Sequence, residues 1–183
     1  MRIISGENRG RKLTQIKGWD IRPTSDRARE AIFNIIGPSI RDCRVLDLFA
    51  GTGALGLEAL SRGACEAVFV EMAKASCDAV KENIQRCNQA DRALLLNQDA
   101  TLLAFAPSQA PFDLVFLDPP YDKGLVDQVL NHDQFLSLVT DDAMVVVEQS
   151  TKEPPLQIPK GLDIYRQKKY SKTRVTFLTR SDV

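Results

Sequence analysis

The sequence predicts an α/β domain with a mostly parallel β-sheet, a closing antiparallel hairpin and a small N-terminal β-hairpin. After Pro38, apolar runs of strand length alternate with helical stretches, which is typical of a parallel sheet covered on both faces. A glycine-rich turn follows the first run, as in α/β folds that bind cofactors. Beyond Pro159 the apolar residues alternate one by one, which predicts two final strands. With 183 residues, 44% of them hydrophobic, we expect one domain over residues 1–183.

The N-terminal residues 1–21 predict a basic hairpin that is appended to this domain. The turn-rich residues 5–10 separate two short extended stretches. A helix is then predicted from Thr24, whose side chain can cap it, to the stop signal at Gly37 and Pro38. Its expected buried face consists of the apolar residues Ala28, Ala31, Ile32 and Ile35.

The centre of the chain contains five predicted strands and the helices that connect them. The strands cover residues 44–48, 67–70, 93–97, 114–117 and 143–148. The helices cover residues 54–62, 73–88 and 123–131, with weaker patterns at 101–105 and 133–139. Parallel strands end at one edge of their sheet, and ligands of such folds bind there.

The charged residues are distributed unevenly along the chain. The 24 basic and 24 acidic side chains give a net charge of zero, which alone argues against a nucleic-acid partner. Residues 1–30 and 160–180, however, carry net charges of +4 and +6, which leaves −10 for the rest. If the two ends lie side by side, they form a basic surface able to contact phosphates; solvated surface charge is the alternative.

Several classes of site are not expected. The four cysteines lack the close spacing of a zinc site, and the single histidine, His132, is expected to be an ordinary surface residue. We therefore predict no metal. No apolar run reaches membrane-spanning length and no leader-like segment precedes the domain, so a cytoplasmic protein is expected.

The first strand leads into a glycine-rich turn and then a helix. Gly51 and Gly53 can adopt positive φ and let a ligand approach the backbone, while Gly56 lets the helix pack closely on the sheet. Nicotinamide-dependent oxidoreductases use the same pattern, and a purely structural turn would also explain it. The glycine spacing therefore leaves the cofactor open.

Residues near two strand ends narrow the choice of cofactor. Phe49 to Gly53 resembles the first motif of Rossmann-like methyltransferases, and the carboxylate of Asp47 suits a ligand with an ammonium group and no pyrophosphate. Glu71 ends the second strand, where it can accept hydrogen bonds from both ribose hydroxyls; a surface acid is the alternative. Met72 is predicted either on the face of an adenine or in the core.

Asp99 and Ala100 follow the third strand. Such folds place an acid here to accept a hydrogen bond from the adenine amino group, and we predict both residues in the cofactor site. An aspartate before a short helical stretch is also a good helix N-cap.

The most specific motif is Asp118-Pro119-Pro120-Tyr121, directly after the fourth strand. The two prolines fix the backbone, so that the Pro119 carbonyl points outwards beside the Asp118 carboxylate. These two acceptors suit one NH₂ group on an aromatic ring, whose delocalised lone pair makes it a poor nucleophile. Accepting both N–H bonds makes the nitrogen more tetrahedral and directs its lone pair towards a methyl donor. Tyr121 is predicted to stack on a base turned out of its helix or loop.

The order of these motifs resembles amino-group methyltransferases with a Rossmann-like seven-stranded sheet. Residues 1–11 and 22–30 are similar to the bacterial RsmD-type family of 16S ribosomal RNA guanine-N2 methyltransferases, and the match covers nearly the whole chain. The resemblance implies S-adenosylmethionine as cofactor and the N2 amino group of a guanine as target. It also implies that Arg22 and Thr24 help to close over the methionine end of the cofactor.

The resemblance implies 16S ribosomal RNA as partner, alone or in a partly or fully assembled small subunit, and we expect a monomeric enzyme. The target-base roles fall on Asp118, Pro119, Pro120 and Tyr121. The side chains predicted to contact RNA phosphates are Arg2, Arg9, Arg11, Lys12, Lys168, Lys169, Lys172 and Arg174.

Three alternatives stay open. The same chemistry would serve adenine N6 in DNA or RNA or a protein glutamine, although little chain is left for a DNA-reading module and a protein substrate would not explain the basic ends. The glycines alone would fit an oxidoreductase. An RNA-binding assembly factor without turnover is disfavoured by the intact Asp118 and Tyr121.

Overall fold

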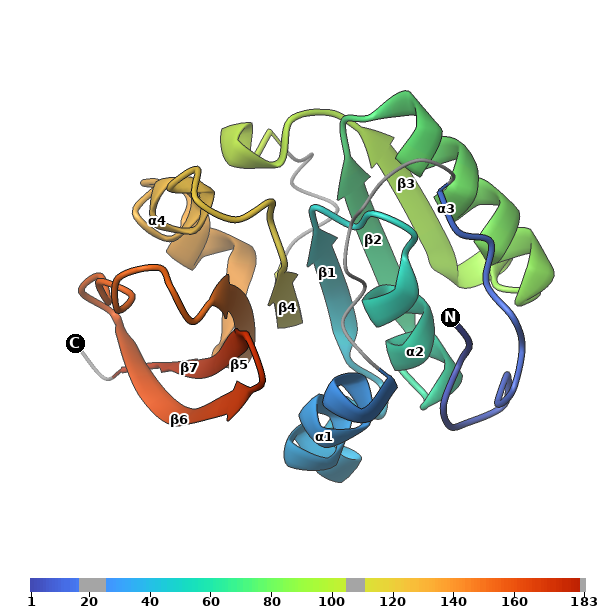
Figure 1. The fold of residues 1–183 in the computed structure, drawn as a ribbon, viewed down its shortest axis with the longest axis horizontal. Helices are drawn as coiled ribbons and strands as arrows, with labels where there is room; N and C mark the ends of the chain where they lie inside the picture. The colour runs from blue at the N-terminus through green and yellow to red at the C-terminus, as the bar shows by residue number, and fades with distance from the viewer. Residues whose placement is uncertain (17–25, 105–110, 182–183) are drawn as a thin grey trace.

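Seven strands form one mixed sheet in the computed structural model, which describes residues 1–16, 26–104 and 111–181 (Figure 1). Their order across the sheet is β3-β2-β1-β4-β5-β7-β6. The strands are β1 (Arg44–Leu48), β2 (Glu66–Glu71), β3 (Ala93–Asn97), β4 (Phe112–Leu117), β5 (Val139–Ser150), β6 (Leu162–Tyr170) and β7 (Thr173–Arg180). The α-helices are α1 (Asp26–Ile36), α2 (Ala54–Ser61), α3 (Lys74–Arg86) and α4 (Leu125–Leu130). Short 3₁₀ helices are η1 (Gly37–Ile40), η2 (Ala90–Arg92), η3 (Ala100–Leu102) and η5 (Phe135–Leu138).

Strands β1 to β5 are parallel, and β7 is antiparallel to both of its neighbours, β5 and β6. The fold class predicted from the sequence is confirmed. β5 is longer than predicted because it has two partners: its pairing with β7 continues to Ser150, opposite Thr173. Among the described helices, none is long and apolar enough to cross a membrane.

Each face of the sheet carries its own hydrophobic layer. Phe116 and Val146 belong to the layer packed against α1, α2 and α3, whereas Leu117 and Val147 belong to the layer covered by α4. Successive side chains of a strand point to opposite faces. The same alternation therefore determines on which face of the sheet the residues directly after each strand lie.

Helix α1 buries a face that differs in part from the predicted one. The prediction was only partly right for Ala31 and Ile35, which are partly buried, although Ile35 packs against the core. It counted apolar residues only and so missed Arg29, whose guanidinium donates a hydrogen bond to the carbonyl oxygen of Arg2 (2.7 Å). The buried residues of α1 are Ala28, Arg29, Ile32, Phe33 and Ile36. The predicted cap, Thr24, lies outside the described residues.

The N-terminal hairpin packs against α2. Its two arms meet in one antiparallel bridge between Arg2 and Lys12. Glu58 of α2 is fully buried and accepts hydrogen bonds from two backbone N–H groups of the hairpin (2.7 and 3.0 Å). Residues 17–21 of the predicted hairpin segment lie outside the described residues, and a single domain over the whole chain stays a prediction.

The two basic ends of the chain lie on opposite flanks of the sheet (Figure 1). The hairpin contacts α2 and α3; the Arg11 guanidinium donates to the backbone carbonyl of Arg86, for example. β6 is the edge strand at the other end of the sheet. The described residues therefore do not form the single basic surface that would arise if both ends lay together.

Candidate active site

The predicted functional residues gather at the edge of the sheet where β1, β2, β4 and β5 end. These strands are parallel, so their C-terminal ends lie together. The glycine turn follows β1, Glu71 ends β2 and Asp118 follows β4. Arg22 and Thr24, predicted to close over a cofactor, lie outside the described residues.

The turn after β1 is held in an unusual backbone conformation. Gly51 and Gly53 have φ angles of 57° and 76°, and Phe49 has a φ of 62° although it is not a glycine. A non-glycine residue in this region costs on the order of 1 kcal/mol or more, and such strain tends to persist at ligand sites. The N–H of Ala50 donates to the carbonyl of Val70 (3.0 Å), which ties the turn to β2.

Asp47 braces this turn from within the sheet. Its side chain is only 2% exposed, and Oδ2 accepts a hydrogen bond from the N–H of Gly56 (2.9 Å). Burial raises the pKa of Asp47 to about 8; the Gly56 hydrogen bond opposes the rise, and the charges of Asp118 and Glu71 add to it. A side chain at Gly56 would not fit, because a Cβ there would lie 2.4 Å from Cε1 of Phe69. Asp47 thus fixes the start of α2, and its cofactor role stays a prediction.

Glu71 joins the glycine turn to the start of α3. Its Oε2 accepts a hydrogen bond from the N–H of Gly51 (3.0 Å), and its Oε1 accepts from the N–H groups of Met72 (2.9 Å) and Ala73 (2.8 Å). These three bonds use three of the about four acceptor positions of a carboxylate, which leaves one for a ribose hydroxyl; the predicted contact with both hydroxyls stays a prediction.

Two apolar side chains are exposed at the ends of β2 and β3. Met72 is 65% exposed, so the alternative that it belongs to the core is wrong. Leu102 in η3 is also exposed and was not predicted, because the sequence pattern does not distinguish it from a core leucine. Exposed apolar side chains beside a carboxylate suit a ligand with a flat apolar ring and polar substituents.

Asp99 caps the N-terminus of η3, which was the alternative to its predicted contact with adenine. Its Oδ1 accepts hydrogen bonds from the N–H (2.9 Å) and the hydroxyl (2.8 Å) of Thr101, which lies in η3. Ala100 is buried beside it. The adenine contact of both residues stays a prediction.

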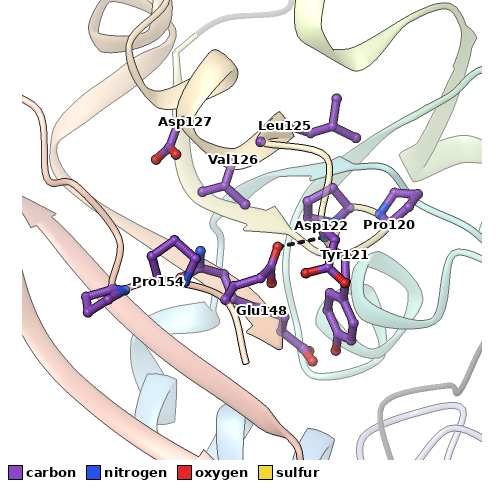
Figure 2. Close-up of a pocket in the computed structure, with 13 residues that line it drawn as sticks. Pro120, Tyr121, Asp122, Leu125, Val126, Asp127, Glu148 and Pro154 are labelled. Atoms are coloured by element: carbon purple, nitrogen blue, oxygen red, sulfur yellow. Dashed lines mark hydrogen bonds between the residues drawn. The ribbon is translucent and has the colours of Figure 1, made fainter. Parts of the chain in front are cut away.

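The motif 118–121 leaves β4 at the side of a cavity of about 270 Å³ (Figure 2). Tyr121 is exposed, and its hydroxyl lies 3.4 Å from Oγ1 of Thr173. Partial burial raises the pKa of Tyr121; the Thr173 hydrogen bond lowers it, and the charges of Asp118, Glu148 and Glu153 raise it. The phenol is therefore neutral at pH 7, which suits a stacking surface and not a base.

The cavity contains acidic and amide side chains that the sequence prediction missed. Glu148 and Gln149, at the end of β5, line it together with Glu153. The Glu153 carboxylate accepts hydrogen bonds from the N–H groups of Asp122 (2.8 Å) and Ser150 (2.7 Å), which fixes the loop after β5. Glu148 ends an apolar run just as Glu71 does, and that signal could have identified it.

Three of the predicted RNA-binding residues lie close to this cavity in the sheet. Lys168, Lys169 and Lys172 are exposed at the end of β6 and in the turn to β7, which is the edge where β5 ends. Arg2, Arg9, Arg11 and Lys12 are also exposed, but on the hairpin at the other flank.

Arg174 departs from the prediction. It is only 8% exposed, and its guanidinium donates hydrogen bonds to the carbonyl oxygens of Pro154 (3.2 Å) and Glu153 (3.4 Å). The strand register turns this arginine inwards, where it supports the cavity wall. We therefore exclude it from the proposed RNA surface.

Among residues 1–16, 26–104 and 111–181, no group of three His, Cys, Asp or Glu side chains is arranged to hold a metal ion.

A family model described as Conserved hypothetical protein 95 matches residues 1–179. The chain belongs to this family. Two relatives are named Ribosomal RNA small subunit methyltransferase D. The one from Escherichia coli strain K12 is 38% identical over 92% of this chain and 84% of its own length, and the one from Haemophilus influenzae is 37% identical over 92% and 88%. The RsmD-type resemblance is confirmed, and the chain is a methyltransferase of this family.

Solved structures share the whole fold. One from Escherichia coli, described as a methyltransferase, has a TM-score of 0.85 and 36% identity, and the match covers 98% of this chain and 97% of that one. A Thermus thermophilus protein has a TM-score of 0.79 at 29% identity, with 99% of both chains covered. A Pyrococcus horikoshii structure, with a TM-score of 0.73 at 19% identity, supports the fold alone.

Proposed function

We propose that this protein transfers a methyl group from S-adenosylmethionine to the exocyclic N2 amino group of a guanine in 16S ribosomal RNA. The observation that carries the proposal is the position of the Asp118-Pro119-Pro120-Tyr121 motif, directly after β4, at the strand edge that also holds the glycine turn. The names of the relatives, which are small-subunit ribosomal RNA methyltransferases, supply the substrate class.

The residues at the ends of β1 and β2 fit the proposed cofactor. The strained turn from Phe49 to Gly53 admits a ligand close to its backbone, Glu71 offers a carboxylate for ribose hydroxyls, and the exposed Met72 offers an apolar face for adenine. When bound, S-adenosylmethionine supplies an electrophilic sulfonium methyl group.

The residues after β4 prepare the nucleophile. Asp118 and the Pro119 carbonyl accept the two N–H bonds of the guanine amino group and direct its lone pair outwards. Tyr121 stacks on the base and holds it out of the RNA fold. The amino proton becomes acidic once the nitrogen carries the extra bond, so Asp118 or water can take it late and no strong base is required.

The exposed lysines beside the cavity are the proposed phosphate-binding residues. Changing Lys168, Lys169 and Lys172 together to Glu should weaken RNA binding and reduce the dependence of its affinity on salt by a slope of roughly three, one for each phosphate that is no longer neutralised. The same changes at Arg9, Arg11 and Lys12 test the predicted RNA contacts of the hairpin on the other flank. Titration of RNA binding over a range of salt concentrations measures both, and an unchanged slope in the first variant would show that these lysines are merely solvated.

The direct test is transfer of labelled methyl groups to small ribosomal subunits, and to their naked RNA, from cells that lack this gene. Nucleoside analysis identifies the product. Labelled N2-methylguanosine in 16S RNA supports the proposal. Comparing methylation of intact small subunits with that of naked RNA shows whether the enzyme needs an assembled subunit as its substrate. Label in adenosine, DNA or protein, or no label at all, would refute the substrate assignment.

A further inference from the structure

We propose that Glu148 reads the target base, its carboxylate accepting the N1–H of the guanine whose N2 amino group is held by Asp118 and the Pro119 carbonyl. This inference rests on the proposed function. It names the side chain that distinguishes guanine from adenine, a choice that the Asp118 motif cannot make because both bases carry an exocyclic amino group.

The register of the sheet brings Glu148 next to Asp118. β4 and β5 are parallel neighbours, and Leu117 pairs with Val147 at the end of their ladder. Asp118 directly follows β4, and Glu148 is the next residue of β5. Because side chains alternate along a strand, they lie on the same face as Phe116 and Val146, whose side chains share one hydrophobic layer.

Glu148 is placed to contact a ligand and not bulk solvent. It is 2% exposed and lines the same cavity as Pro119 and Tyr121 (Figure 2). A carboxylate in such a place favours a partner that donates hydrogen bonds. A base stacked on Tyr121 would bring its Watson–Crick edge towards this wall.

A second observation indicates that the cavity receives a hydrogen-bond donor. Gln149 is 7% exposed and lines the cavity, yet within the described residues no donor lies within hydrogen-bond distance of its Oε1. Buried polar atoms are nearly always satisfied in native structures, by protein, water or ligand. The guanine edge uses its three N–H bonds on Glu148, Asp118 and the Pro119 carbonyl. Gln149 lies on the opposite face of β5 from Glu148, so its oxygen would accept from another donor of the bound RNA.

Guanine presents the matching pattern of donors. Its N1–H and its N2 amino group are adjacent and provide three N–H bonds on one edge, whereas adenine presents an amino group beside N1, which carries a lone pair and no hydrogen. The Glu148 carboxylate would face that lone pair with its own, and both groups would lose water without gaining a bond. A site built in this way rejects the wrong base far better than one that relies on shape.

The test uses 2-aminopurine, which keeps the 2-amino group of guanine but has an unprotonated N1. Once the methylated position is mapped, small-subunit RNA carrying guanosine or 2-aminopurine at that position is offered to the wild type, to Glu148→Gln and to Asp127→Asn. Asp127 is a matched control, because its exposed carboxylate lines the same cavity from α4. Thermal melting and S-adenosylmethionine affinity verify that each variant is folded.

The wild type should prefer guanosine strongly. Glu148→Gln should lower that preference by roughly tenfold or more, because its amide can donate to N1 and the charge-assisted hydrogen bond to N1–H is lost. Asp127→Asn should leave the preference unchanged. An equal rate of the wild type on both RNAs would overturn the inference whatever the variants do, and so would an unchanged preference in Glu148→Gln. If the wild type methylates no guanosine RNA, the proposed function itself has failed.

Discussion

The half of the site around β1 and β2 and the half around β4 and β5 use acidic residues differently. In the first half, the protein's own backbone engages the carboxylates: Asp47 accepts from Gly56, and Glu71 accepts from Gly51 and from the start of α3. In the second half, the backbone engages Glu153, which fixes the loop after β5, and Glu148 lines the cavity at the end of β5, beside the end of β4 that Asp118 follows.

This difference separates two kinds of preorganisation. The first half holds its shape through internal hydrogen bonds, so its acids combine a structural role with the proposed cofactor role. In the proposed mechanism, the second half presents acceptors to the substrate, so changes there should affect turnover and base selection more than folding or cofactor affinity. Four substitutions test this division.

The largest effect is expected for Asp118→Ala. It removes an acceptor that acts on the reacting amino group, so turnover should fall by roughly 100- to 1000-fold while the affinity for S-adenosylmethionine stays nearly the same. Single-turnover methylation and calorimetric titration measure the two quantities. Asp118→Asn, which keeps one oxygen acceptor, should fall between the wild type and the alanine variant. A comparable loss of cofactor affinity would place Asp118 in the other half of the site.

Glu71→Ala should show the opposite profile. Loss of a charged hydrogen-bond acceptor should weaken binding of S-adenosylmethionine by roughly 10- to 100-fold, with a smaller effect on turnover at saturating cofactor. Glu66→Ala, at the other end of β2, is the matched control and should bind the cofactor like the wild type. Unchanged affinity in the Glu71 variant would mean that its role is only to brace the turn.

Gly56→Ala tests how tightly α2 packs on β1 and β2. Within a helix, alanine is better than glycine by about 1 kcal/mol. The new Cβ, however, would lie 2.4 Å from Phe69, and overpacking of this kind costs about 1–3 kcal/mol. We expect a net loss of stability in chemical denaturation. Adding Phe69→Leu should recover part of it, and a Gly56→Ala variant as stable as the wild type would contradict the close packing.

A pH dependence of stability should originate at Asp47. Its pKa rises from 3.8 to about 8 on folding, so the folded protein binds a proton that the unfolded chain releases between these values. The free energy of unfolding should therefore fall as pH rises from about 4 to 8, by at most about 1.4 kcal/mol per pH unit, and level off above 8. Asp47→Asn should lack this component. Parallel denaturation curves of the two proteins at pH 5, 6, 7 and 8 measure the difference, which should be constant if Asp47 is not protonated.

Local sequence patterns were most informative where function depends on a short segment. The residues of the glycine turn after β1 lie within a few positions of one another, as do those of the motif at Asp118. The succession of strands and helices along the chain follows from the alternation of apolar runs. These features depend on backbone preferences and periodicity, which neighbouring residues determine.

Long-range pairing decided the rest. Arg174 turned inwards instead of towards RNA, because its place in β7 follows from the register with β5. Glu58 became a fully buried acceptor because the N-terminal hairpin packs on α2. Both outcomes depend on segments distant in sequence.

The sequence by itself determined the α/β class and the family, and it predicted a cofactor turn after β1 and a target-base motif at Asp118. Only the tertiary structure decided that the basic ends lie on opposite flanks and that Glu148 and Gln149 line the cavity beside Tyr121. The physical reason is that periodicity states which side of its own strand a residue occupies, whereas its neighbours across the sheet depend on strand order and register, which the whole core selects together.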